Sequence, residues 1–155
     1  MIEKTHYVCV TGIIRKHGKY LICKRSSIEK VFPNKWCVPG GKIEIKDFIE
    51  SPKDTNHHWL DIFEKILRKE IREETGLEIK NIGYVSNLAF IRSNGYSTII
   101  ISLNADYDAG EIKLAQDELV EYAWVTLEEA KKYDLIDNIY EQIEKVDKKF
   151  NEELL

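Results

Sequence analysis

Glu70, Glu73 and Glu74 are the residues whose types and spacing most directly suggest chemistry in this chain. In a helix, residues three and four positions apart lie on the same face, so these carboxylates would share one side. Like charges in this arrangement repel one another. The cluster is therefore expected either to lie in bulk water or to share a bound cation.

The apolar residues of the same segment favour the shared cation. At about 100° per residue, Phe63, Ile66, Leu67 and Ile71 fall between roughly 40° and 180° from Ile62. The three glutamates fall near 20°, 80° and 120°, whereas the basic residues occupy the opposite side. Buried carboxylates are costly unless they are paired or bind a metal. The pattern predicts a packed helix that ends in a metal-binding cluster of acids.

Length and composition indicate one globular domain. The chain has 155 residues, of which 43% are hydrophobic and 32% are charged, and its net charge is −4. A negative net charge gives no basic footprint for nucleic acid, so no nucleic-acid partner is expected. No signal-peptide pattern or membrane-spanning run is expected either. The three cysteines are typical of free thiols in a reducing compartment, which predicts a cytoplasmic protein.

Hydrophobic periodicity and turn residues place further elements around the acidic helix. Strands are expected over residues 7–14, 20–23, 82–91, 96–103 and 119–125. The acidic helix is expected over residues 60–75, ended by Gly76. Thr126 opens a capping box, and a last amphipathic helix is expected over residues 137–150. These elements predict an α/β fold in which helices flank both faces of a sheet.

Two loops surround this pattern. Residues 32–41 contain two prolines and end in Gly40-Gly41, and such a glycine pair lets backbone amides approach a ligand closely. Residues 43–58 are polar and mixed, and they are expected to form a surface loop that is either a lid or a dimer contact. His57 and His58 lie in this loop without a nearby Cys or third His, so we interpret them as loop residues rather than metal ligands.

The glycine pair and the run from Lys69 to Leu77 together resemble the Nudix hydrolase superfamily, whose members include MutT-like enzymes. The family signature is a glycine, five residues, a glutamate, seven residues and then R-E-U-x-E-E-x-G-U, where U is bulky and aliphatic. Its second half is matched by Glu70, Ile71, Glu73, Glu74, Gly76 and Leu77. Residues 36–44 and 117–125 resemble the family's approach to the signature and its late strand. The resemblance implies one Nudix-like α/β/α sandwich with a mixed sheet over residues 1–155.

The chain departs from this signature at two points. Lys69 takes the place of the family's Arg, which keeps the charge but loses the planar fork. An insertion at about residues 43–58 splits the motif, because counting forward from Gly41 puts the first acid at Asp47 and counting back from Lys69 puts it at Asp61. We favour Asp61, because an acid suits the start of a helix, but the choice between the two stays open.

The resemblance implies hydrolysis of a diphosphate linkage with Mg²⁺, or alternatively Mn²⁺, as cofactor. Clustered carboxylates bind such ions through oxygen, and Mg²⁺ also bridges phosphate oxygens. Water polarised by the metal would attack phosphorus. The implied metal ligands are Glu70, Glu73, Glu74 and the backbone carbonyl of Gly41. The implied catalytic residues are Glu70, Lys69 as the residue that steers it, and the late-loop acid Glu118, with Glu121 as the runner-up.

The candidate substrate-binding residues are Arg25, Trp36, Gly40 and Lys42. Arg25 could meet phosphates, and Trp36 could stack on a base, although core packing is the alternative for every aromatic residue here. The expected substrate is a small nucleoside diphosphate derivative, preferably a nucleoside triphosphate that yields a nucleoside monophosphate and pyrophosphate. A nucleotide sugar, ADP-ribose and a non-catalytic role as a Nudix-like ligand sensor are the alternatives. No membrane partner is expected, and the protein is either a monomer or a homodimer.

Overall fold

Strand β1 (His6–Lys16) is the centre of one mixed sheet in the computed structural model, which describes residues 4–154. It runs parallel to β6 (Ser97–Ala109), which pairs in turn with β5 (Glu78–Ile91) in the antiparallel sense. On its other side, β1 pairs with β2 (Lys19–Arg25). The order across the sheet is β3-β2-β1-β6-β5, with β7 (Leu119–Val125) also paired with β2.

The sheet forks along β1. Near its carboxyl end, β1 pairs with β2, whereas its middle residues Cys9 to Thr11 pair with the short strand β4 (Gly40–Lys42). Strand β3 (Trp36–Cys37) instead pairs with β2. The turn between β3 and β4 therefore moves the chain from one branch of the fork to the other and brings the glycine pair beside β1.

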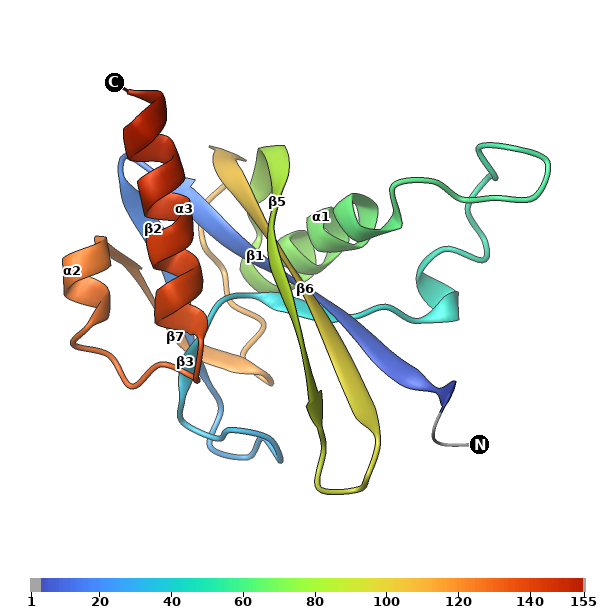
Figure 1. Cartoon of the computed structure of the whole chain (residues 1–155), viewed down its shortest axis with the longest axis horizontal. Coiled ribbons are helices and arrows are strands. Elements are labelled where there is room, and N and C mark those ends of the chain that lie inside the picture. Colours follow the sequence, from blue (N-terminus) through green and yellow to red (C-terminus); the bar gives the residue numbers. More distant parts are fainter. Residues whose placement is uncertain (1–3, 155) are drawn as a thin grey trace.

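Helices cover both faces of the sheet, as expected from the sequence (Figure 1). Ile14 points to the face covered by α1 (Ile62–Thr75), and its neighbour Ile13 points to the face covered by α3 (Ile139–Glu153). The short helix α2 (Leu127–Ala130) lies on the α3 side. The predicted α/β/α arrangement with a mixed sheet is confirmed, and its two cores are separated by the period-two alternation of β1.

Most element boundaries lie close to the predicted ones. Strand β7 has the predicted bounds, and the hydroxyl of Thr126 accepts a hydrogen bond from the Glu129 amide, as a capping box requires. Strands β5 and β6 are longer than predicted, because β-bulges carry their pairing through a polar stretch. Strands β3 and β4 were absent from the prediction, since two or three residues are too few to show an alternating pattern.

The segment between β4 and α1 is mostly exposed and projects beside the start of α1 (Figure 1), which confirms the predicted surface loop. A 3₁₀ turn, η2 (Ile45–Asp47), opens it. The rest is held by two contacts: the Trp59 ring packs on Phe48 at 5.2 Å, and the Asp54 carboxylate lies 2.9 Å from the Lys65 amine of α1.

Within residues 4–154, no helix is long and apolar enough to cross a membrane.

Candidate active site

The carboxyl-terminal half of α1 is fixed in place on both sides. Ile66, Leu67 and Ile71 are buried against the sheet, as the apolar stripe predicted. Gly76 ends the helix with a φ of 78°, which glycine adopts without strain. The amides of Lys113 and Ala115 donate to the last helical carbonyls, so the end of the helix is also anchored by the segment that leads to Glu118.

Glu74 is the most buried acid of the cluster, with only 7% of its surface exposed. Its Oε2 accepts a hydrogen bond of 3.1 Å from the amide of Gly40. Burial raises the pKa of Glu74 to about 9, although the Gly40 amide opposes the rise. The neighbouring acids Glu118 and Glu70 add to this rise in the pKa. The fork in the sheet therefore places the backbone amide of Gly40 beside Glu74, whose pKa is also influenced by Glu118 and Glu70.

Glu70 lies against Gly41. A Cβ atom at Gly41 would be 2.5 Å from both the carboxyl carbon and Oε2 of Glu70, so only glycine allows this approach. Burial raises the pKa of Glu70 to about 7, Lys69 opposes the rise, and the charges of Glu73, Asp47 and Glu118 add to it. Glu70 therefore lies against Gly41, whereas Glu74 binds the amide of Gly40.

Glu73 departs from the prediction that all three glutamates point inward. Its side chain is 56% exposed, and its carboxylate forms an ion pair with the Lys69 amine at 3.1 Å. The physical reason is its angle: at about 20° it lies at the margin of the apolar stripe, next to the basic side of the helix. Phe63, at the start of the predicted apolar stripe, is likewise 39% exposed.

Lys69 also contacts the acid whose position the sequence left open. The Asp47 carboxylate lies 3.1 Å from the Lys69 amine, and only 4% of the Asp47 side chain is exposed. Its second oxygen accepts a hydrogen bond of 2.8 Å from the Glu44 amide. Burial alone would raise the pKa of Asp47, but the amide and Lys69 hold it below the usual value.

Asp61 lies at the other end of α1. It has a left-handed φ of 54°, and its side chain makes no capping hydrogen bond. Nine residues separate it from Glu70, which is about 13 Å along a helix. The interpretation that favoured Asp61 as the first acid is therefore wrong in geometry, because the structure brings Asp47 and not Asp61 to Lys69.

The two candidates for the late-loop acid, Glu118 and Glu121, have different partners in the structure. Glu118 ends the segment that caps α1, and its carbonyl accepts a hydrogen bond from the Ser26 amide, which holds the loop against β2. Glu121 instead forms an ion pair with Lys24 at 3.6 Å. Only Glu118 of the two contacts Glu74, so the geometry favours Glu118 over the runner-up.

Two candidate substrate-binding residues are occupied by the protein itself. The Arg25 guanidinium lies 3.1 Å from the Glu29 carboxylate and donates to the Val31 carbonyl, so it holds the loop after β2. The Trp36 ring packs edge-on against Tyr133 at 4.7 Å, which is the core-packing alternative. Neither side chain is directed to the acids by these contacts.

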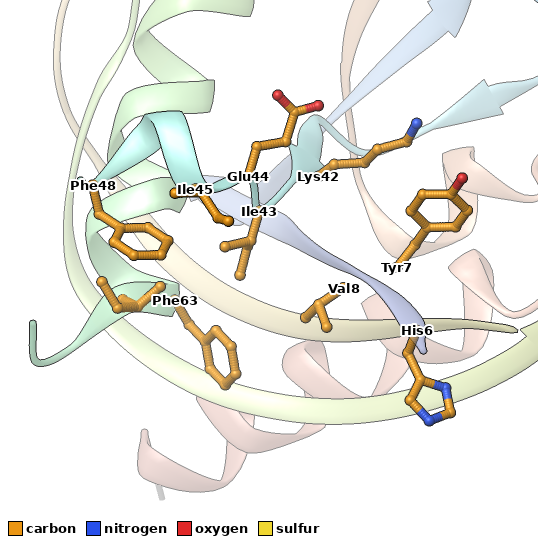
Figure 2. A pocket seen from close by; sticks show the side chains of 10 residues that line it. His6, Tyr7, Val8, Lys42, Ile43, Glu44, Ile45, Phe48 and Phe63 are labelled. Carbon is orange, nitrogen blue, oxygen red and sulfur yellow. The ribbon is translucent and has the colours of Figure 1, made fainter. Parts of the chain in front are cut away.

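The other two candidates lie on β4. The Gly40 amide is used by Glu74, so the close approach of this backbone serves the carboxylate rather than a phosphate. The Lys42 amine lies 5.0 Å from the centre of the Tyr7 ring. Figure 2 shows Lys42 and Tyr7 among the side chains of one recess, together with Val8 and Ile43. That recess of about 430 Å³ is lined by residues of β1, of α1 and of the segment between β4 and α1, and it includes none of the signature glutamates.

The residues around Glu74 fit a divalent cation by their chemistry. Glu70, Glu74 and Glu118 are acidic oxygen donors in a partly dry site, and their mutual repulsion would be relieved by a cation. Within residues 4–154, no three such side chains already stand in ligand geometry, so rotations of the carboxylates are needed. The Gly41 carbonyl stays a predicted ligand.

Comparison with known proteins identifies the family. The family model described as the NUDIX domain matches residues 4–146, and the chain therefore belongs to the Nudix hydrolase family. It is a pyrophosphohydrolase of the Nudix type, a class of enzymes that generally use divalent metal ions.

Individual relatives agree with this assignment. The chain is 29% identical over 136 residues to the nucleoside triphosphatase NudI of Klebsiella pneumoniae, covering 81% of this chain and 86% of the relative. Its fold is similar to that of a MutT NUDIX hydrolase from Burkholderia pseudomallei, with a TM-score of 0.72, 21% identity and coverage of 92% and 99%. The NUDIX domain of Shewanella oneidensis NrtR, solved with ADP ribose, has a TM-score of 0.71 at 16% identity, with coverage of 95% and 90%.

Proposed function

We propose that this chain hydrolyses a nucleoside triphosphate to a nucleoside monophosphate and pyrophosphate with Mg²⁺ as its cofactor. The observation that carries the proposal is the convergence of Glu70, Glu74 and Glu118 beside the glycine pair. The similarity to a nucleoside triphosphatase over most of both chains supports this choice of substrate. Free cysteines support the cytoplasm as its compartment.

Each acid has a part in this proposal. Glu74 and Glu118 hold the cation, and Glu73 joins them by exchanging its ion pair with Lys69. Mg²⁺, when bound, neutralises phosphate charge and lowers the pKa of water. Glu70 accepts the proton of the attacking water at its carboxylate, which lies against Gly41 beside the other acids.

Asp47 and Lys69 position this machinery rather than take part in the chemistry. Lys69 bridges Asp47 and Glu73 through one ammonium group, which can contact two carboxylates without the planar fork of an arginine. The Asp47–Lys69 ion pair thereby joins η2, which follows β4, to α1. The positive charge of Lys69 also opposes the rise in the pKa of Glu70.

The split motif and Lys69 are the observations that favour a non-catalytic ligand sensor as the second candidate. The two functions differ in turnover. Pyrophosphate release should be measured with nucleoside triphosphates, a nucleotide sugar and ADP-ribose, each with Mg²⁺ and with EDTA. The proposal expects turnover of a triphosphate that EDTA abolishes. Binding without turnover of any of these compounds would contradict it and would support the sensor.

A further inference from the structure

Arg92 and Lys42 meet around one tyrosine on the α3 side of the sheet. The Arg92 guanidinium lies 4.5 Å from the centre of the Tyr7 ring, and the Lys42 amine lies 5.0 Å from it. The Tyr96 ring contacts the same tyrosine at 5.5 Å. Three segments distant in the sequence, β1, β4 and the β5–β6 hairpin, thus bring two cations and two aromatic rings together.

Arg92 is anchored by the protein through its Nε, and its side chain also lies next to the Cys9 thiol. Its Nε donates a hydrogen bond of 2.6 Å to the hydroxyl of Thr98, which is 1% exposed. This contact uses one edge of the guanidinium, and a planar fork binds oxyanions with its terminal nitrogens. The orientation of Arg92 is therefore set by the protein before any ligand arrives.

Neither cation has an acidic partner among residues 4–154, since no carboxylate lies within ion-pair distance of Arg92 or Lys42 there. Both act on Cys9: burial raises the pKa of this thiol, and the charges of Arg92 and Lys42 oppose the rise. Two cations that repel each other, one of them half-buried, are stabilised by a shared anion.

The register of β1 gives the distance from this cluster to the acids. Thr11 pairs with Gly40, whose amide binds Glu74, and Cys9 pairs with Lys42. At about 3.3 Å per residue, Cys9 and Tyr7 lie about 7 Å and 13 Å along the strand from Thr11. The acids lie on the α1 side and the cations on the α3 side, so a ligand meets both by passing through the fork between β3 and β4, which do not pair with each other.

We propose that Arg92 and Lys42, over the Tyr7 ring, bind a further oxyanion of the substrate, beyond the two phosphates whose linkage is cleaved. This proposal rests on the proposed function and narrows its substrate class. The oxyanion is either the terminal phosphate of a nucleoside triphosphate or a carboxylate or phosphate on the group linked to a nucleoside diphosphate. A neutral linked group gains nothing from these residues.

Binding of inorganic ligands tests the site without turnover. Dissociation constants of tripolyphosphate and pyrophosphate should be measured calorimetrically with Mg²⁺ for the unmodified chain, Arg92→Gln and Arg15→Gln. Arg15 is the matched control, because its guanidinium also lies over an aromatic ring. This ring belongs to Phe150 of α3, and its centre is 3.9 Å from the guanidinium. Loss of a charge-assisted hydrogen bond predicts that Arg92→Gln weakens tripolyphosphate by at least about tenfold and leaves pyrophosphate unchanged. Equal effects on both ligands, or no effect, would overturn the proposal.

Turnover then distinguishes the two sources of the oxyanion. KM should be compared between the same variants for UTP, for UDP-glucuronate, which carries a carboxylate, and for neutral UDP-glucose. A rise in KM with UTP alone assigns the site to the terminal phosphate, and a rise with UDP-glucuronate assigns it to the linked group. An equal rise with UDP-glucose contradicts the proposal. Failure of the unmodified chain to hydrolyse any of them would instead contradict the proposed function.

Discussion

Asp47 Oδ1 lies 3.1 Å from Lys69 Nζ, so an acid at the end of η2 is joined to the third turn of α1. This ion pair brings two residues together in space that are separated by 22 positions in the sequence. The Asp47 side chain is nearly fully buried and also accepts a hydrogen bond from the Glu44 amide. The Asp47–Lys69 ion pair is therefore a structural joint between η2 and the catalytic helix α1.

Asp47→Asn tests this joint. The substitution removes the charge that Lys69 and the Glu44 amide contact, and Lys69 is 38% exposed, so a loss of about 1 kcal/mol in the free energy of unfolding is expected. Asp61→Asn is the matched control and should change it by less than about 0.5 kcal/mol, since its side chain makes no capping bond. Urea denaturation measures both. A larger loss in the Asp61 variant would show that the joint is assigned to the wrong acid.

Gly41→Ala should reduce turnover strongly while the chain still folds. The new Cβ would displace the Glu70 carboxylate, which is the end of a flexible side chain and can move, and a shift of about 1 Å at a reacting group can cost about a hundredfold in rate. Gly83→Ala makes the same change against Asn104, outside the site. Steady-state kinetics and circular dichroism should be recorded for both variants. Normal turnover of Gly41→Ala would mean that Glu70 need not occupy this position.

The raised pKa values predict how the metal-free protein responds to pH. The folded protein holds the Glu70 and Glu74 protons up to pH values near 7 and 9, whereas the unfolded chain releases them near 4.5. Between those values the folded state binds more protons, so stability should fall as pH rises from about 5 to 9. The slope is at most about 1.4 kcal/mol per pH unit for each group.

Urea unfolding in EDTA at pH 5, 7 and 9 measures this slope. Glu74→Gln should flatten it most above pH 7, because Glu74 has the higher pKa. A divalent cation should also flatten it, since it replaces the protons that the acids share. Stability that rises over this range in EDTA would contradict the buried, uncompensated state of these carboxylates.

Sequence reasoning reached the fold and most of the acid cluster because both follow from local periodicity. The stripe of α1 identified Ile66, Leu67 and Ile71 as core and placed Glu74 beside them. The same helical wheel failed for Glu73, because an angle at the edge of a stripe does not decide between the core and a neighbouring Lys69.

Long-range contacts were beyond this reasoning. The pairing of Asp47 with Lys69 depends on how the inserted segment returns to α1, which no spacing rule describes. Arg92 was not singled out, because its proximity to Lys42 arises from the register of three strands. Arg25 and Trp36 were plausible ligands by type, but a local ion pair with Glu29 and a long-range ring contact with Tyr133 occupy them.

The inserted segment is expected to be dispensable for turnover. The side-chain contacts of residues 50–59, such as Trp59 on Phe48 and Asp54 with Lys65, are made within the segment and with the first turn of α1. Replacing residues 50–59 by a Gly/Ser segment of equal length should therefore leave kcat near that of the unmodified chain. Loss of turnover with retained folding would show that the segment closes over the substrate, and a change in mass by light scattering would reveal a dimer contact.

Pyrophosphate release from a nucleoside triphosphate with Mg²⁺ shows whether the acids on α1 hold a divalent cation for diphosphate hydrolysis. The unmodified chain and Glu152→Gln, an exposed acid on α3, should turn over and lose activity in EDTA. Glu74→Gln should lose at least about a hundredfold in kcat, in the range seen when one transition-state contact is removed. Full activity of Glu74→Gln, or activity that persists in EDTA, would show that hydrolysis does not depend on a divalent cation held by Glu74.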